Sequence, residues 1–157
     1  MLETYSDAIH FADESLSQDI LLLCKDTASP EPDRSRRKIL VVDDQKLIAD
    51  TIVQIFQDAG FEAVAAYDGW SALEIAGRLR PDLLLSDVLM PQMNGVQLAI
   101  AMRRNHPETK IVLFTGQAGI SEILLEGKEK GYEFELLPKP IHPLKLIERI
   151  KELAAEP

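Results

Sequence analysis

Cysteine and histidine are scarce in this 157-residue chain. Its one cysteine, Cys24, can form no disulfide within the chain, and a cysteine-rich zinc site is excluded. The three histidines, His10, His106 and His142, are far apart and lack the spacing of metal ligands. No basic segment follows Met1, and the longest early apolar run, residues 20–24, is too short for a signal peptide or a membrane span. These absences predict a soluble cytoplasmic protein.

Basic residues are also fewer than acidic ones. The chain has 17 lysines and arginines against 26 aspartates and glutamates, a net charge of −9. Nucleic-acid-binding domains usually carry a basic footprint, so the composition argues against that class. With 46% hydrophobic and 27% charged residues, the composition is that of an ordinary globular protein, and the length fits one domain with a tail.

The first 37 residues differ from the rest. They contain eight acidic and four basic residues, and residues 27–37 are rich in proline, serine and charge, as linkers are. We therefore predict an N-terminal extension and linker over residues 1–37 and a folded domain over residues 38–157. A short helix over residues 17–23 is the one element expected in the extension. A disordered tail, a docking or dimerisation helix and a misassigned start codon remain alternative interpretations.

From residue 38 onward, short apolar runs alternate with helical stripes. Strands are predicted at residues 39–42, 61–66, 83–85, 111–114 and 134–137, and helices at 45–59, 70–79, 95–104, 120–130 and 143–155. Strands that are apolar on both faces belong in a parallel sheet covered by helices on both sides. The pattern therefore predicts an α/β fold with a five-stranded, parallel, doubly wound sheet and five helices.

Polar side chains follow four of these strands, and ligands of such sheets bind at the carboxyl ends of the strands. The residues are Asp43, Asp44, Asp87, Thr115 and Lys139. Three converging carboxylates repel one another unless a cation lies among them, and hard oxygen ligands suit Mg²⁺ or Mn²⁺. Together with a hydroxyl and an ammonium group, they predict a phosphoryl site, where a carboxylate can itself accept the phosphoryl group.

Each of these residues also has an ordinary interpretation. Asp43 and Asp44 could cap a helix, Asp87 could lie in a loop, Thr115 could belong to a turn, and Lys139 could be a solvated surface lysine. The occurrence of all five residues at strand ends, in this order, favours the functional interpretation.

These residues and their neighbours resemble the receiver domain of two-component response regulators. The resemblance runs from Lys38 to about Ala155 and is carried by four segments: ILVVDD at residues 39–44, DVLMPQMNG at 87–95, FTG at 114–116 and PKP at 138–140. It implies a flavodoxin-like strand order of 2-1-3-4-5. It also implies that Lys139–Pro140 is a cis peptide bond.

The resemblance further implies a role for each site residue. Asp87 would be the phosphoacceptor. Mg²⁺ would be bound directly by Asp44, Asp87 and the backbone carbonyl of Leu89, and through water by Asp43. Thr115 would donate a hydrogen bond to the phosphoryl group, and Lys139 would form an ion pair with it.

The implied reaction is phosphoryl transfer from a sensor histidine kinase or a histidine phosphotransfer protein to Asp87. Such a protein is a signalling phosphoacceptor that catalyses only its own phosphorylation and dephosphorylation, and not an enzyme in the usual sense. In the family, the residues at the positions of Leu89 and Gln117 tune the hydrolysis. Because an apolar Leu89 offers no hydrogen bond to the attacking water, we predict slow to moderate dephosphorylation.

Signalling in the family passes from the threonine to the face of helix four, strand five and helix five, where an unknown output protein would bind. An aromatic residue usually lies three positions before the lysine, where this chain has Leu136. Phe134 could take that role in a shifted register, although plain core packing is the favoured interpretation. The chain ends soon after the last helix, which predicts a stand-alone receiver that acts by partner binding or phosphorelay without binding DNA or membranes.

Two alternatives come from other classes of protein. The first is an interaction module that works without phosphorylation, a degenerate receiver, although all five site residues are present. The second is an aspartate-nucleophile phosphatase of the haloacid dehalogenase kind, which needs a second acid where this chain has Leu89. A Walker-type nucleotide fold is excluded because no glycine-rich loop follows the first strand. A flavodoxin would need a phosphate-binding loop there, and the two acids would repel a phosphate.

Overall fold

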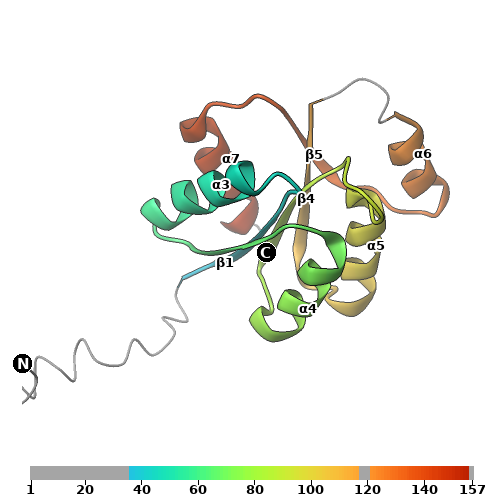
Figure 1. Cartoon of the computed structure of the whole chain (residues 1–157), viewed down its shortest axis with the longest axis horizontal. Coiled ribbons are helices and arrows are strands. Elements are labelled where there is room, and N and C mark those ends of the chain that lie inside the picture. Colours follow the sequence, from blue (N-terminus) through green and yellow to red (C-terminus); the bar gives the residue numbers. More distant parts are fainter. Residues whose placement is uncertain (1–35, 117–120, 156–157) are drawn as a thin grey trace, which may run out of the picture. The chain divides into compact units, whose positions relative to one another are not determined.

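The computed structural model describes residues 36–116 and 121–155. The helix predicted at residues 17–23 lies outside this part of the chain. Five parallel strands form one sheet in the order β2-β1-β3-β4-β5, which confirms the predicted topology (Figure 1). The strands are β1 (Lys38–Val42), β2 (Glu62–Ala66), β3 (Leu83–Asp87), β4 (Lys110–Thr115) and β5 (Glu135–Pro138).

Five helices alternate with the strands, as predicted. They are α3 (Lys46–Asp58), α4 (Gly69–Leu79), α5 (Gly95–Asn105), α6 (Ser121–Glu129) and α7 (Pro143–Ala155). Two separate hydrophobic clusters place them in layers: α3 and α7 pack on one face of the sheet, and α4, α5 and α6 on the other (Figure 1). The chain therefore forms three layers with the sheet in the middle.

Strand β1 shows why these strands are apolar throughout. Its side chains alternate between the faces, so Ile39 and Val41 enter the cluster with α3 and α7, and Leu40 and Val42 enter the other. All four are at most 1% exposed. A strand covered on both sides needs apolar residues at every position, and this produces the continuous run seen in the sequence.

Local signals explain where several helices begin. Asn94 accepts a hydrogen bond from the backbone N–H of Gln97, and the Gln97 side chain accepts one from Asn94, which is a capping box at the start of α5. Asp68 caps α4 by accepting from the N–H of Ser71. Helix α3 is different, because its N-cap residue is Gln45. Asp43 and Asp44 are therefore not the capping pair that was the alternative interpretation.

The last strand begins one residue later than predicted. The register pairs Val112 of β4 with Glu135, so Phe134 precedes β5. Phe134 packs against the cluster beneath α4, α5 and α6 and stacks on Tyr132, with ring centroids 6.1 Å apart. Its apolar side chain made the strand look as if it began one residue earlier. None of the described helices is long and apolar enough to cross a membrane.

Candidate functional site

Three carboxylates meet at the carboxyl edge of the sheet. Asp43 and Asp44 follow β1, and Asp87 ends β3, the neighbouring strand. One oxygen from each carboxylate lies within 4.8 Å of the other two. Asp43 is buried, Asp87 is partly buried and Asp44 is exposed, so the cluster opens to solvent on one side. Carboxylate oxygens at this spacing, with room for water, are the donor set that Mg²⁺ or Mn²⁺ prefers.

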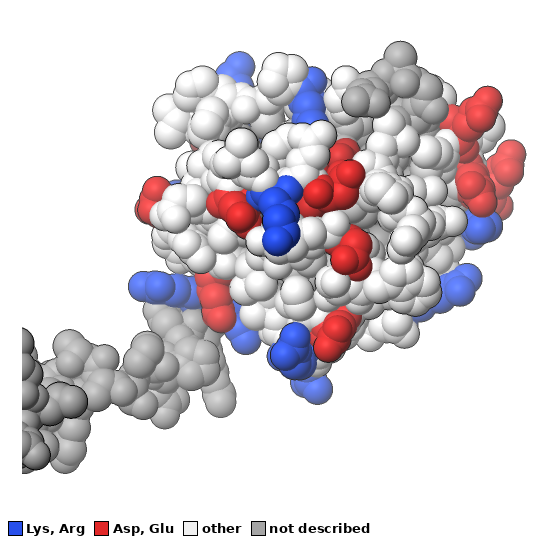
Figure 2. Space-filling model, viewed as in Figure 1, with Lys and Arg blue, Asp and Glu red and all other residues white. Residues whose placement is uncertain are grey.

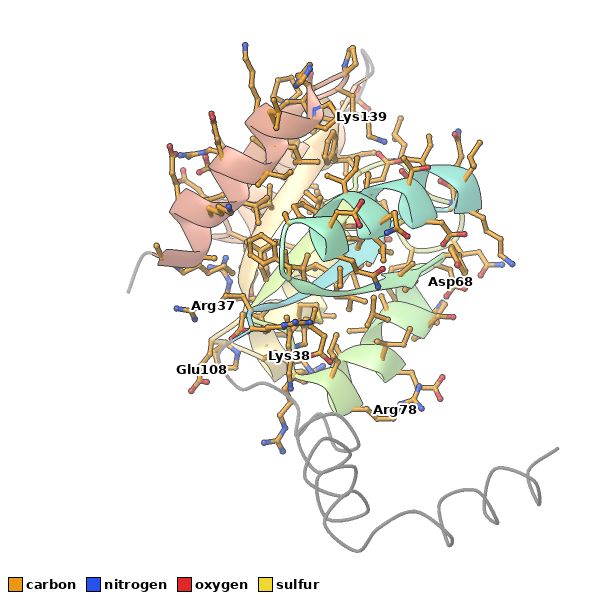
Figure 3. The ribbon with its side chains drawn as sticks, turned by 90° about the vertical axis from the view of Figure 1, so that its left-hand side faces the viewer. Arg37, Lys38, Asp68, Arg78, Glu108 and Lys139 are labelled. Atoms are coloured by element: carbon orange, nitrogen blue, oxygen red, sulfur yellow. The ribbon has the colours of Figure 1, made fainter. Side chains whose placement is uncertain are left out.

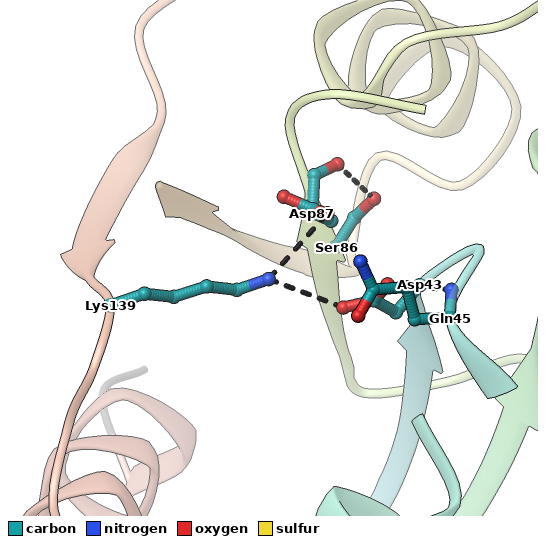
Figure 4. A network of polar contacts seen from close by, with 5 residues as sticks. All are labelled: Asp43, Gln45, Ser86, Asp87 and Lys139. Carbon is teal, nitrogen blue, oxygen red and sulfur yellow. Dashed lines mark hydrogen bonds and ion pairs between the residues drawn. The ribbon is translucent and has the colours of Figure 1, made fainter. Parts of the chain in front are cut away.

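Lys139 places its ammonium group among these acids. Its Nζ lies 3.2 Å from Oδ2 of Asp43 and 3.5 Å from Oδ2 of Asp87 (Figure 4). Lys139 follows β5, at the end of the sheet opposite to Arg37, Lys38 and Glu108 (Figure 3). One ammonium faces three carboxylates, so the site keeps a negative charge that a divalent cation would offset.

The electrostatic environment of Asp87 differs from that of an ordinary surface aspartate. Burial raises the pKa of its carboxyl group, the charge of Lys139 acts to lower this pKa, and the charge of Asp43 acts to raise it. The net effect is a pKa above the ordinary value for an aspartate. The ionised form of this carboxyl group is therefore electrostatically unfavourable, and a bound cation or the loss of its negative charge would remove that penalty.

The backbone around Asp87 is held from two sides. The hydroxyl of Ser86, which is fully buried, donates a hydrogen bond of 2.9 Å to the backbone carbonyl of Asp87 (Figure 4). A Cβ at Gly95 would lie 2.1 Å from the same carbonyl oxygen, so only glycine fits there. The N–H of Gly95 also donates to the carbonyl of Val88 at 2.8 Å. These contacts fix the end of β3 against the start of α5.

The last two strands meet the site through Thr115 and Lys139. The backbone N–H of Lys139 donates to the carbonyl of Thr115 at 2.7 Å, and a Cβ at Gly116 would lie 2.8 Å from the Cβ of Lys139. The peptide bond between Lys139 and Pro140 is cis, as the resemblance implies.

A cavity of about 510 Å³ opens over the cluster. The predicted residues that line it are Asp44, Asp87, Leu89, Thr115 and Lys139. Asp43 lies below, with its other carboxylate oxygen accepting the N–H of Gln45 at 2.9 Å. The structure therefore brings together every site residue predicted from the sequence. Gln117 lies outside the described residues.

Ser86 and Gly95 were not identified as site residues from the sequence. Ser86 is a polar residue in an otherwise apolar strand, and this exception was the one sign in the sequence that it has a special role. Gly95 closes a quoted motif, but its contact with the carbonyl of Asp87 depends on how the loop after β3 folds back. Gln45 was assigned to a helix, and its N–H contact with Asp43 depends on the turn after β1.

Phe134 and Leu136 have different environments. Phe134 is partly buried in the core, and the guanidinium carbon of Arg103 lies 5.3 Å from its ring centroid. Leu136, three residues before Lys139, is 44% exposed. Core packing, the favoured interpretation for Phe134, agrees with this contact set. The described structure therefore has an exposed aliphatic side chain at the position that the family usually fills with an aromatic one.

The fold and the site define a class: a doubly wound parallel sheet with an acidic pocket and a lysine at its carboxyl edge. Comparison with known proteins agrees. The family model for the response regulator receiver domain matches residues 39–151. The chain belongs to this family.

Three similar proteins illustrate the relationship. The DNA-binding response regulator MtrA of Mycobacterium tuberculosis is 33% identical over 119 residues, which are 76% of this chain and 51% of MtrA. The transcriptional regulatory protein CpxR of Escherichia coli is 34% identical over 116 residues, which are 74% of this chain and 48% of CpxR. The solved structure of the chemotaxis protein CheY4 of Vibrio cholerae has a TM-score of 0.67 at 33% identity, covering 75% of this chain and 98% of CheY4.

The chain thus spans about half the length of the two regulators and nearly all of the chemotaxis protein. Receiver domains belong to two-component signalling, where an aspartate is phosphorylated. They bind Mg²⁺ through an acidic pocket and have histidine kinases or phosphotransfer proteins as partners. They are signalling proteins, not enzymes in the usual sense.

Proposed function

We propose that Asp87 is the phosphoacceptor of this receiver and that a protein phosphohistidine is the donor. The observation that supports this most strongly is the position of Asp87, whose carboxylate lies beside an ammonium group, near two further acids and at the wall of an open cavity. In the transfer, the bond between phosphorus and the imidazole nitrogen breaks and a bond to a carboxylate oxygen of Asp87 forms. The imidazole, protonated on its other ring nitrogen, leaves as the neutral group, and the step needs no oxidant or reductant.

The donor set fits Mg²⁺, which Asp44, Asp87 and the backbone carbonyl of Leu89 would bind directly and Asp43 through water. The bound cation would neutralise charge on the phosphoryl oxygens. The protein's own groups do the remaining work. Lys139 offers an ammonium to the phosphoryl group, and Thr115, at the cavity wall, offers a hydroxyl.

Hydrolysis of the aspartyl phosphate would reset the protein, and Leu89 bears on its rate. Leu89 lines the cavity and is 37% exposed, so its side chain reaches the region that an attacking water must cross. An isobutyl group cannot orient a water by hydrogen bonding. We therefore infer slow to moderate self-dephosphorylation.

The output surface would be the face of α6, β5 and α7. It has a groove of about 460 Å³ between α6 and β5, with Leu125, Phe134 and Leu136 in its lining. Acidic side chains gather over α6 (Figure 2). An output protein with apolar and basic side chains would fit this groove, and neither DNA nor a membrane is proposed as a partner. We also propose that residues 38–157 are the signalling domain and that residues 1–37 are an extension of it.

The first test is the intact mass of the protein after incubation with acetyl phosphate and Mg²⁺. We expect one added phosphoryl group in the wild type, and none in Asp87→Asn or in the presence of EDTA. A matched control, Asp58→Asn, changes an exposed aspartate on α3 outside the cavity and should be labelled like the wild type.

Failure of this test would redirect the assignment. If the wild type gained no phosphoryl group and beryllofluoride left its spectrum unchanged, the protein would be an interaction module that works without phosphorylation. If Asp87→Asn were still labelled, another side chain would be the acceptor.

A further inference from the structure

One polar side chain is buried in apolar surroundings beneath the candidate site. Ser86 lies in β3 and is fully buried. Because side chains alternate along a strand, it faces the same side of the sheet as Leu84, toward the hydrophobic cluster under α4, α5 and α6. Its register partners on the two neighbouring strands, Val42 and Leu113, belong to the same cluster. A hydroxyl group in such surroundings is unfavourable unless it forms a hydrogen bond.

The partner of this hydroxyl is the backbone of Asp87. The hydroxyl donates to the carbonyl of Asp87 at 2.9 Å (Figure 4). The pairing of β1 with β3 ends at Val42 and Ser86, one residue before Asp87. A side chain therefore donates to this carbonyl at the point where the neighbouring strand no longer pairs with β3.

The next backbone groups along the chain are held as well. The N–H of Val88 donates to the carbonyl of Phe114 on β4 at 3.3 Å, and the carbonyl of Val88 accepts the N–H of Gly95 at 2.8 Å. Together with the bond from Ser86, these contacts fix the peptide group between Asp87 and Val88 at its oxygen and at its nitrogen. The backbone is thereby held up to the residue before the expected carbonyl ligand of the metal.

This stretch of backbone joins two of the proposed metal ligands, the carboxylate of Asp87 and the carbonyl of Leu89. The peptide groups between them set the distance and direction from one oxygen to the other. Mg²⁺ requires a near-ideal octahedral set of oxygens, so a small displacement of either ligand weakens the site. The same displacement would move the carboxylate that accepts the phosphoryl group, and misplacement of a reacting group slows a reaction steeply.

We propose that Ser86 is a positioning residue for phosphoryl transfer, whose hydroxyl fixes the Asp87 carboxylate and the Leu89 carbonyl relative to each other through the peptide group after Asp87. The proposal rests on the proposed function of Asp87. Ser86 is fully buried and acts through the backbone, without contact with the phosphoryl group. A serine that only satisfies its own hydroxyl is the ordinary alternative. Its removal would leave the rate of transfer unchanged in a protein that stays folded.

Four variants of the full chain separate the hydroxyl from the space around it. Ser86→Ala removes the hydroxyl and adds no volume. Ser86→Thr keeps the hydroxyl and adds a methyl group, and Ser86→Val has the shape of threonine without the hydroxyl. Thr109→Val is the matched control, because the buried hydroxyl of Thr109 donates to the carbonyl of Pro81 at 2.8 Å. Thr109 precedes β4, so this bond of the same kind lies at the edge of the sheet opposite to Asp87.

The first measurement is the initial rate of labelling by acetyl phosphate at limiting Mg²⁺, followed by intact mass. We expect the rate to fall about ten-fold in Ser86→Ala and to stay within about two-fold of the wild type in Thr109→Val. Ser86→Thr should be labelled faster than Ser86→Val. The second measurement needs no activity: in the metal-free protein, the carbonyl carbon resonance of Asp87 should shift in Ser86→Ala and Ser86→Val but not in Ser86→Thr. Titration with Mg²⁺ should then show weaker binding in the two variants that lack the hydroxyl.

Several results would overturn the proposal. Normal labelling of Ser86→Ala would do so, and so would an equal loss in Thr109→Val, which would assign the effect to lower stability. Equal rates in Ser86→Thr and Ser86→Val would show that the hydroxyl is not the group that matters. Circular dichroism identifies the folded variants, and if the added methyl group prevents folding, the comparison of Ser86→Ala with Thr109→Val decides. If the wild type itself is not labelled, the proposed function of Asp87 fails.

Discussion

Lys139 should be a main determinant of stability when no divalent cation is present. Its Nζ lies 3.2 Å from Asp43 and 3.5 Å from Asp87, and the side chain of Asp43 is only 3% exposed. Lys139→Met removes the ammonium and keeps the aliphatic stem. At an effective dielectric constant of about 20, each contact contributes an attraction of about 5 kcal/mol, most of which offsets the desolvation of the ions.

The variant loses the attraction but leaves the carboxylates desolvated. For fully buried pairs, removing one partner costs about 3–5 kcal/mol. The side chain of Lys139 is 26% exposed, so water can partly replace it, and we expect a loss of about 2 kcal/mol in the free energy of unfolding. Mg²⁺ should reduce the deficit, because it supplies positive charge to the same carboxylates.

The assay is urea unfolding at pH 7, followed by circular dichroism, first in EDTA and then across a Mg²⁺ series. Lys145→Met is the matched control, since this lysine is exposed on α7 and its loss should change stability by less than about 0.5 kcal/mol. The reasoning is refuted if Lys139→Met is as stable as the wild type in EDTA, or if Mg²⁺ stabilises both proteins equally.

Four further predictions follow from the same contacts. Asp87→Asn should stabilise the metal-free protein at neutral pH, because a raised pKa in the folded state makes the ionised carboxylate unfavourable there. Urea midpoints should show that this gain in stability shrinks as the pH falls toward about 3.9, where the carboxyl group of the unfolded chain also becomes protonated. Gly95→Ala should cost about 1–3 kcal/mol in urea unfolding and slow labelling by acetyl phosphate, because its Cβ would meet the carbonyl of Asp87. Asn94→Ala should cost about 1 kcal/mol in the same unfolding assay by removing the cap of α5. Leu89→Asn should shorten the lifetime of the aspartyl phosphate, followed as the decay of the phosphorylated mass.

Each of these has a contrary outcome. A gain from Asp87→Asn that persists unchanged at low pH would assign the effect to something other than the charge. Gly77→Ala is the control for Gly95, since a Cβ there meets nothing within 4 Å and should stabilise α4; a loss as large as that of Gly95→Ala would contradict the clash argument. An unchanged urea midpoint in Asn94→Ala would show that the cap does not stabilise α5. An unchanged or longer lifetime in Leu89→Asn would show that the apolar side chain of Leu89 does not slow hydrolysis.

Much of the fold could be predicted because local patterns carried it. The run from Ile39 to Val42 is apolar at every position, and such a run is typical of a strand covered on both faces. The ends of elements were less certain. Phe134 looked like part of β5 because strands and core-packed loops both favour aromatic residues, and only the pairing of Val112 with Glu135 places the boundary.

The site residues could be named from the sequence because each follows a strand, and the carboxyl ends of parallel strands share one edge. Their partners could not be named. The contact of Ser86 with the carbonyl of Asp87, and the space that Gly95 leaves for it, depend on how the loop after β3 returns to α5. No spacing in the sequence encodes that return.

The sequence by itself determined the alternation of strands and helices, the set of acids and the lysine, and the edge of the sheet to which they belong, because these follow from periodicity and from strand direction. Only the tertiary structure decided which oxygens Lys139 meets, why Asp87 has a raised pKa, and that Leu47, Trp70 and Leu144 are exposed. Distance, burial and exposure arise when segments far apart in the chain pack against one another, and a linear pattern records none of them.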